Sequence, residues 1–436
     1  MAASLYALVD GNNFYVSCER VFRPSLNGQP VIVLSNNDGC AIARSNEAKA
    51  LGIAMGAPWF KIKQLQETHG LVALSANFCL YGDLSDRMMS LVAGLGHRQE
   101  IYSIDESFID MSGVRGDLIK RCRTIRERVL RWVGIPCCIG LGPTKTLAKL
   151  ANHIAKTAER KPGSYPAELA QICNLADLNR DALESVLANT AVDEVWGVGK
   201  RISFQLKQAG IETVLQLSRM DLATVRTRWS VVLERTVREL QGQACVDLED
   251  VAPDKQEIAC TRSFGRPVTE LADLKEAVSE FASRAAEKLR RQHGLANLVH
   301  AFVRTSPFRP DPQYSGSIVV PLRRATADST QIAEAALAGL AQIFKPGFLY
   351  AKVGVMLLEL QPDSVQQDEL DLEPEQDKDL GELMGTLDQI NRRYGRGTVL
   401  LASTGLAGDR RRWAMKQERR TPQYTTRWED MPVIRA

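Results

Sequence analysis

Several features that would narrow the function are scarce in this sequence of 436 residues. It has only five histidines and nine cysteines, and no two cysteines form a Cys-x-x-Cys pair. Because the histidines show no ligand spacing, we expect no zinc site, and an odd number of scattered cysteines favours reduced thiols over a disulfide framework. The first apolar run ends at Asp10 and no basic segment precedes it. We therefore expect no signal peptide.

Long hydrophobic runs and a strong excess of one charge are also missing. No apolar run approaches the about 20 residues of a membrane-spanning helix, so we expect a cytoplasmic protein without membrane contacts. The formal net charge of +3 does not by itself indicate a nucleic-acid partner. The charge is segmented, however, with +5 over residues 115–131 and −7 over residues 362–380. Such segregation is expected when one face of a protein meets a polyanion.

An acidic pair between two apolar runs is the most informative local pattern. Residues 101–110 read Ile-Tyr-Ser-Ile-Asp-Glu-Ser-Phe-Ile-Asp, and both flanks of the pair predict strands. Asp105 and Glu106 repel one another and lose hydration when partly buried, so a cation is expected to offset them. A second apolar run, residues 5–9, predicts a strand that ends at Asp10. If the two strands lie side by side, the three carboxylates form an all-oxygen site that suits Mg²⁺ or Mn²⁺ and phosphate substrates.

These residues also have ordinary interpretations. The acids can be turn residues at strand ends, and a tyrosine at a helix start, such as Tyr15, is often part of a core. Lys49 and Lys156 are candidate triphosphate ligands, but lone lysines are usually solvated. Gly197 and Gly199 frame a turn before a predicted helix, where backbone N–H groups can bind a phosphate. The same two glycines can equally form a helix C-cap.

The pattern of elements predicts a multidomain protein of the α+β class. Residues 1–170 mix strands and helices about one core, with a helix expected over residues 42–51. Residues 171–245 are expected to be almost entirely helical. Residues 256–360 predict the order β-α-β-β-α-β, which leaves one face of a sheet open. Three arginines at strand ends of this last domain can hold phosphates: Arg304, Arg323 and Arg324.

Four motifs together resemble those of Y-family translesion DNA polymerases. They are Asp10-x-x-x-Phe14-Tyr15, the loop at 35–40, Tyr102-Ser103-Ile104-Asp105-Glu106 and the segment at 142–149. The likeness is strongest to the UmuC-type catalytic subunits of bacterial DNA polymerase V and their plasmid-borne relatives, and it extends over nearly the whole chain. The resemblance implies a right-hand polymerase with a palm at 1–34 and 72–170, fingers at 35–71, a helical thumb with a helix-hairpin-helix at 171–245, a linker at 246–255, a β-α-β-β-α-β little finger at 256–360 and a tail at 361–436.

The resemblance also implies an activity and a set of site residues. The activity is error-prone addition of dNTPs to the 3′-OH of primer-template DNA, with two Mg²⁺ ions (Mn²⁺ is an alternative), opposite damaged bases in the SOS response. The implied metal and catalytic residues are Asp10, Gly11, Asp105 and Glu106. The implied nucleotide site contains Phe14, Tyr15 as the steric gate, Ala43, Lys49 and Lys156. The implied DNA contacts are Gly197, Gly199, Lys200, Arg304, Arg323 and Arg324.

Two details of the nucleotide site follow from the same resemblance. Lys49 stands where other family members carry an arginine, and a lysine cannot bind a phosphate bidentately. Small residues at Cys40, Ile42 and Ala43 would form the roof over the nascent base pair, which implies weak shape checking and low fidelity.

The implied partners are a UmuD′-type dimer, RecA and the β sliding clamp, in the bacterial nucleoid. The residues Gln367, Leu370 and Leu372 resemble the anchors of a clamp-binding peptide, although a solvated acidic linker explains them as well. Two alternative functions remain open. One is another two-metal palm enzyme, such as a nucleotide cyclase, and the other is a non-catalytic subunit that binds damaged DNA.

Overall fold

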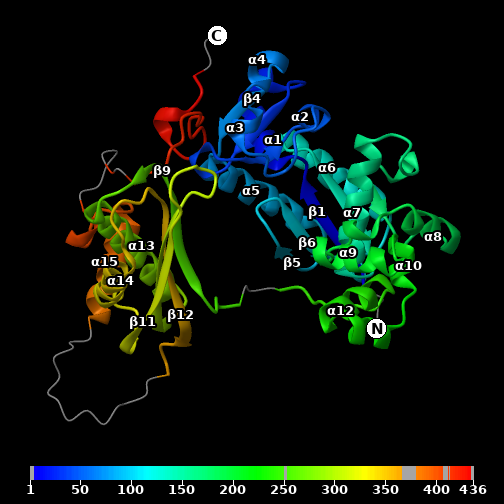
Figure 1. Ribbon diagram of the computed structural model, residues 1–436. Coiled ribbons are helices and arrows are strands. Elements are labelled where there is room, and N and C mark those ends of the chain that lie inside the picture. Colours follow the sequence, from blue (N-terminus) through cyan, green and yellow to red (C-terminus); the bar gives the residue numbers. More distant parts are fainter. Residues whose placement is uncertain (1–3, 250–252, 366–379, 406–410, 412, 434–436) are drawn as a thin grey trace. The chain divides into compact units, whose positions relative to one another are not determined.

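The structure is a computed structural model that describes residues 4–249, 253–365, 380–405, 411 and 413–433. Its contacts divide the described residues into two units, which are coloured along the chain in Figure 1. The first unit takes the residues up to 35, residues 39–249 and the residues from 419 onward. The second unit takes residues 36–38 and the residues from 253 to 418.

A five-stranded sheet forms the centre of the first unit, in the order β5-β6-β1-β7-β8. Strand β1 pairs antiparallel with both β6 and β7, and β8 continues the sheet parallel to β7. Every residue of β1 and β7 is buried, which is why both strands read as unbroken apolar runs. The strand bounds are β1 Tyr6–Gly11, β5 Gln99–Ile101, β6 Glu106–Asp110, β7 Cys137–Gly142 and β8 Ile172–Asn174.

Four amphipathic helices pack around this sheet. Helix α6, for example, buries Cys122, Ile125 and Val129 at steps of three and four residues, the spacing of one helix face. Helix α7 approaches β7 closely, because a Cβ atom on Gly140 would lie 2.1 Å from the backbone nitrogen of Asn152. The bounds are α1 Phe14–Phe22, α5 Phe78–Val92, α6 Leu118–Val133 and α7 Lys145–Arg160.

Three further strands of the first unit form a separate sheet in the order β3-β2-β4. We predicted a helix over residues 42–51. This prediction is wrong for residues 42–44, which belong to strand β3. Residues 41–44 instead pair with β2, and Ser45 caps a short helix by accepting a hydrogen bond from the Ala48 N–H. The apolar stretch was too short for its periodicity to distinguish the two structures. The bounds are β2 Val31–Leu34, β3 Ala41–Arg44, β4 Val72–Ser75, α2 Asn46–Ala50, α3 Trp59–Ile62 and α4 Leu65–His69.

Residues 180–240 contain five helices, and their apolar core includes Leu206, Val214 and Val237 and continues into α7 through Leu150. This agrees with the helical character expected for residues 171–245, apart from β8, which extends the first sheet past residue 170. The domain limits themselves stay a prediction. The helices are α8 Arg180–Ala188, α9 Lys200–Gln208, α10 Val214–Ser218, α11 Leu222–Arg228 and α12 Val231–Leu240.

The second unit has the predicted order β-α-β-β-α-β. Its four strands form an antiparallel sheet in the order β11-β10-β12-β9. One face buries Val299, Ala301 and Val303 against the helices, and Figure 1 shows α13 and α14 on that side. The bounds are β9 Ile258–Val268, α13 Leu271–Arg291, β10 Gly294–Thr305, β11 Ser315–Thr326, α14 Ser329–Ile343 and β12 Tyr350–Pro362, and α15 follows at Gly381–Tyr394. No helix within the described ranges has the length and apolar character needed to cross a membrane.

The close approach of α7 to β7 yields a stability prediction. We expect Gly140→Ala to lower the free energy of unfolding by about 2–3 kcal/mol, because backbone atoms of α7 must move to admit the methyl group. The matched control is Gly82→Ala inside α5, where an added Cβ meets no atom within 4 Å. That change should raise stability by about 0.5–1 kcal/mol. Urea denaturation measures both variants, and equal stabilities would contradict the packing argument.

Candidate active site

The pairing of β1 with β6 brings two of the predicted acids together. Asp10 lies directly opposite Glu106 in the strand register, and the Gly11 N–H donates to the backbone oxygen of Asp105 at 2.9 Å. The side-by-side strands on which the predicted acidic site depended are therefore present. Asp10 itself is buried, whereas Asp105 and Glu106 are half-buried.

Ser103 orders the short turn that carries Asp105. Its hydroxyl donates to Asp105 Oδ1 at 2.6 Å and accepts a hydrogen bond from the Glu106 N–H at 3.1 Å. The turn lies between β5 and β6. Asp105 belongs to this turn, and Glu106 is the first residue of β6. The hydroxyl thus reduces the freedom of the Asp105 carboxylate and holds the backbone of Glu106.

Helix α7 supplies a lysine to each of three neighbouring strands. Lys145 pairs with Glu100 at 2.6 Å, and Lys149 pairs with Glu106 at 3.0 Å. Residues four, seven and eleven positions apart share one helix face, and the third lysine of this stripe, Lys156, lies 2.5 Å from Asp10. Sequence reasoning gave a role only to Lys156. The i, i+4, i+11 spacing of the lysines was the signal that could have indicated the whole stripe.

Burial disfavours the charged form of the Asp10 carboxyl. Burial raises the pKa of the Asp10 carboxyl to about 7, and repulsion by Glu106 and Asp105 adds to the rise although Lys156 opposes it. A carboxyl at such a pKa takes up a proton or a cation near neutral pH. The site therefore favours a bound positive charge.

The acids were predicted to bind Mg²⁺ or Mn²⁺. Within the described ranges, no three His, Cys, Asp or Glu side chains are grouped closely enough to hold a metal ion, and the two lysines pair with the carboxylates. The chemistry of the donors nevertheless fits a hard divalent ion, since all are oxygens and the Asp10 pKa indicates an unmet need for positive charge. The metal thus stays a prediction.

A basic group lies next to the acids. Burial lowers the pKa of Lys49 on α2 to about 8, and repulsion by Arg160, Arg44 and Lys156 lowers it further. The Lys49 ammonium donates to Asn13 Oδ1 at 2.5 Å. Sequence reasoning missed Arg44 and Arg160, which come from the end of β3 and the last turn of α7. Cations that repel one another in this way form a site for an anion.

Tyr15 is half-buried on the first turn of α1 and is surrounded by aromatic rings. It stacks on Tyr81 with ring centroids 4.6 Å apart and meets the edge of Phe78 at 5.9 Å. Burial raises the pKa of the Tyr15 hydroxyl, and Asp105 contributes to the rise. The predicted gate thus lies within electrostatic range of the acidic cluster.

Two other residues of the predicted nucleotide site lie in the core. Phe14 packs with the buried residues of the first unit, and a Cβ atom on Gly11 would lie 2.9 Å from its ring. Ala43 on β3 is also buried, with 8% of its surface exposed. Phe14 therefore presents no accessible edge and acts on the site by supporting the turn at Gly11.

The predicted phosphate-binding turn precedes α9. Gly197 has φ of +89°, a left-handed conformation that favours glycine, and Gly199 is the N-cap of α9. A Cβ on Gly199 would meet no atom within 4 Å, so the helix N-terminus is open. Lys200 is exposed on its first turn. The C-cap alternative is excluded, because Gly199 begins a helix rather than ending one.

The three predicted arginines of the second unit do not come together. Arg304 lies opposite Ser315, whereas Arg323 and Arg324 lie at the far end of the same β10–β11 pair. About seven residues of strand, roughly 20 Å, separate them. The structure instead places Lys352 of β12 opposite Arg304, and burial together with Arg304 lowers the Lys352 pKa. Sequence reasoning missed Lys352 because strand register brings this pair together.

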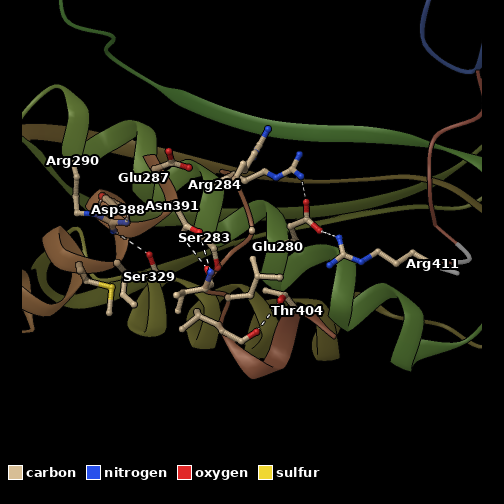
Figure 2. Close-up of a pocket in the computed structure, with 17 residues that line it drawn as sticks. Glu280, Ser283, Arg284, Glu287, Arg290, Ser329, Asp388, Asn391, Thr404 and Arg411 are labelled. Atoms are coloured by element: carbon tan, nitrogen blue, oxygen red, sulfur yellow. Dashed lines mark hydrogen bonds and ion pairs between the residues drawn. The ribbon is translucent and has the colours of Figure 1, made fainter. Parts of the chain in front are cut away.

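The predicted clamp-binding residues Gln367, Leu370 and Leu372 lie outside the described residues. A cavity of about 200 Å³ occurs in the second unit, between α13, α15 and the residues that follow α15. Figure 2 shows Glu280 on α13 between the guanidinium groups of Arg284 and Arg411, with which it forms ion pairs. None of the predicted site residues lines this cavity.

Comparison with known proteins matches two family models to the parts of the chain that hold these residues. The impB/mucB/samB family model matches residues 9–153, and the model of its C-terminal domain matches residues 255–370. The chain is 45% identical to Protein UmuC of Salmonella typhimurium over 98% of its own length and 99% of that protein. The chain belongs to the impB/mucB/samB family. It is a UmuC-type Y-family polymerase.

Other relatives agree with this family. Protein MucB of Escherichia coli is 42% identical over 98% of this chain and 99% of that protein. DNA polymerase IV of Oceanobacillus iheyensis is 24% identical over 68% of both chains. Among solved structures, the Y-family DNA polymerase chimera Dbh-Dpo4-Dbh covers 82% of this chain and 99% of its own, with a TM-score of 0.60 and 16% identity. The fold of this UmuC-type chain is therefore that of a right-hand polymerase. A model called a domain of unknown function also matches residues 382–434.

The basic group yields a prediction that needs no substrate. We expect Arg160→Gln to raise the Lys49 pKa toward the ordinary lysine value, because the largest repelling neighbour is removed. The pKa can be measured by NMR of reductively ¹³C-methylated lysines. Arg131→Gln on the exposed face of α6 is the matched control and should leave the Lys49 pKa unchanged. A Lys49 pKa unaltered by Arg160→Gln would contradict the described grouping.

Proposed function

We propose that this protein is an error-prone translesion DNA polymerase of the SOS response, which adds dNTPs to a primer 3′-OH opposite damaged template bases. The observation that carries the proposal is the pairing of Asp10 with Glu106 beside Asp105, in a chain of the UmuC-type family. A set of acids next to a set of cations suits a metal-bound triphosphate.

The acids and the Gly11 carbonyl would hold two Mg²⁺ ions, or Mn²⁺ in their place. When bound, such ions activate the attacking hydroxyl and stabilise the leaving pyrophosphate of an in-line displacement. Asp10, Asp105 and Glu106 would supply the carboxylate ligands of these ions. The Ser103 hydroxyl would keep Asp105 oriented, through the hydrogen bond that it donates to Oδ1.

The triphosphate would be bound by the basic group that adjoins the acids. Lys49 and Lys156 were predicted for this role, and the mutual repulsion of Lys49, Arg44 and Arg160 supports adding the two arginines. Their planar guanidinium groups can bind phosphate bidentately, which a lysine cannot do. Arg44 would thus compensate for a lysine at the position where other family members carry an arginine.

Tyr15 would exclude the 2′-OH of a ribonucleotide, and the small residues Cys40, Ile42 and Ala43 would accept distorted base pairs. The stacking of Tyr15 on Tyr81 supports a fixed position for the gate. Ala43 is a buried residue of β3, so its part would be to leave room rather than to make a contact. Low fidelity would follow from this loose roof.

DNA would be bound without sequence readout. The open turn at Gly197 and Gly199, with Lys200, would bind one phosphate. Arg304 with Lys352, and Arg323 with Arg324, would make two separate phosphate contacts on the second unit. Binding through phosphates weakens with added salt.

The implied partners also belong to this proposal. A UmuD′-type dimer, RecA and the β sliding clamp are supported by membership of the UmuC-type family and, for the clamp, by the resemblance of Gln367, Leu370 and Leu372 to an anchor peptide. Work at damaged chromosomal DNA would place the protein in the bacterial nucleoid.

The test of the proposed function is primer extension by Asp105 variants. We expect Asp105→Ala to lower extension on damaged template by about 10³-fold or more, since a metal ligand is lost, while primer-template binding persists. Asp110→Asn, at the other end of β6, is the matched control and should retain activity. Extension that survives Asp105→Ala would refute the role of Asp105 as a catalytic metal ligand, whereas a native chain that binds primer-template without extending it would favour a non-catalytic DNA-binding subunit.

The gate gives a second prediction for the reaction. We expect Tyr15→Ala to raise ribonucleotide insertion by about 10–100-fold relative to deoxyribonucleotide insertion, because the ring no longer opposes the 2′-OH. Tyr15→Phe keeps the ring and should keep the discrimination. Single-nucleotide insertion kinetics with dNTPs and rNTPs measure both. Unchanged sugar selection in Tyr15→Ala would remove the gate role.

A further inference from the structure

The chain returns to the first unit after the second unit, through residues 419–433, which we call the return segment. The Ser75 N–H donates to the backbone oxygen of Arg419 at 3.1 Å, and Ser75 forms a parallel bridge with Arg420. The Arg419 guanidinium lies 5.1 Å from the centroid of the Trp59 ring. The return segment therefore joins the end of β4 by backbone pairing.

Thr421 is the buried anchor of this segment, with 6% of its surface exposed. The Asn77 side-chain amide donates to Thr421 Oγ1 at 3.2 Å, to the Thr421 carbonyl at 3.1 Å and to the Pro422 carbonyl at 3.0 Å. Asn77 is itself fully buried and stands just before α5. The Thr421 hydroxyl thus accepts a hydrogen bond from Asn77, and its own hydrogen is available for donation.

The Thr421 hydroxyl donates to a buried carboxylate on α1. Glu19 is fully buried, and its Oε1 atom accepts hydrogen bonds from Thr421 at 3.1 Å and from the Tyr81 hydroxyl at 2.7 Å. Its Oε2 atom has no hydrogen-bond partner within the described ranges. Burial raises the Glu19 pKa, and the hydrogen bonds from Tyr81 and Thr421 act against that rise. The stability of a buried carboxylate depends strongly on each of the hydrogen bonds that it accepts.

Tyr81 connects this carboxyl to Tyr15. Its hydroxyl reaches Glu19, while its ring, which is fully buried, stacks on the Tyr15 ring at 4.6 Å with an interplanar angle of 16°. Tyr15 and Glu19 are four residues apart on α1 and so share one helix face. A second ring contact holds the other end of α1, where Tyr424 of the return segment stacks on Phe22 at 4.7 Å.

We propose that the return segment positions the steric gate: Thr421, acting through Glu19 and Tyr81, fixes the ring of Tyr15 and thereby sets the discrimination between deoxyribose and ribose. This inference rests on the proposed gate role of Tyr15. Thr421, Glu19 and Tyr81 are positioning residues, since they act on the nucleotide through Tyr15. Tyr81 is the link, because the same side chain carries the hydroxyl bound to Glu19 and the ring stacked on the gate.

The experiment compares Thr421→Val with the native full chain in single-nucleotide insertion. Valine keeps the shape of threonine but removes both hydrogen bonds of the hydroxyl. We expect the ratio of ribonucleotide to deoxyribonucleotide kcat/KM to rise about 3–10-fold, the effect of one weakened buried hydrogen bond. Thr421→Ser should restore the native ratio. Thr426→Val, an exposed threonine of the same segment, is the matched control and should leave the ratio unchanged.

A double-mutant cycle tests the path of the effect. Tyr81→Phe keeps the stacked ring and loses only the hydrogen bond to Glu19, so it gives an independent measurement if Thr421→Val folds poorly. Because both changes act on the same carboxyl, we expect the double variant to raise the ratio by less than the product of the two single effects. Multiplicative effects would place Thr421 and Tyr81 on separate paths and overturn the proposal.

The outcomes separate this inference from the proposed function. A native chain that extends no primer would contradict the polymerase itself. If the native chain is active, and Thr421→Val lowers insertion of both sugars equally, the return segment is a structural support only and the inference fails. A raised ratio, with primer-template binding unchanged, supports a positioning role.

Discussion

Negative charge at the end of two paired strands is the constraint on which the first unit depends. The β1–β6 register places Asp10 opposite Glu106, and burial deprives the first of these carboxylates of water. Carboxylates so close together need cations, and helix α7 supplies them with one lysine stripe, at Glu100, Glu106 and Asp10. The helix must then lie close to the sheet. Gly140 permits this, because any side chain there would occupy the space of the α7 backbone.

A group of positively charged side chains lies next to these acids. Burial, together with repulsion by Arg160 and Arg44, lowers the Lys49 pKa to about 8, and burial, together with the neighbouring acids, raises the Asp10 pKa to about 7. Like charges lie close together within each group, and Lys156 links the two groups because it pairs with Asp10 and repels Lys49. A ligand that carries cations on one side and phosphates on the other relieves the repulsion within both groups.

The sequence predicted those parts of the structure that arise from local pattern. Residues 256–360 have the expected order β-α-β-β-α-β, because apolar spacing and turn residues mark the ends of these elements. The stretch at 42–51 was misjudged, since four residues of strand followed by a capped turn of helix carry no clear period. The acids were identified from adjacent residues, and their partnership with Asp10 was predicted on the condition that the two strands lie side by side, which the β1–β6 register fulfils. Arg44 and Lys352 were missed because their neighbours come from other elements. The contact between Thr421 and Glu19 spans 402 residues, and no local pattern reports such a pair.

The return segment also determines when, during synthesis of the chain, the surroundings of Tyr15 can be completed. A chain leaves the ribosome from its N-terminus and its domains fold largely in that order, so β1, β6 and α7 are complete long before residue 419 is synthesised. During that interval Asn77 and Glu19 have no Thr421 to bind. The surroundings of Tyr15 are therefore finished only after the entire second unit has been translated. Translation that stops between the two units would leave the carboxylates in place beside a Tyr15 ring whose support through Tyr81 and Glu19 is incomplete.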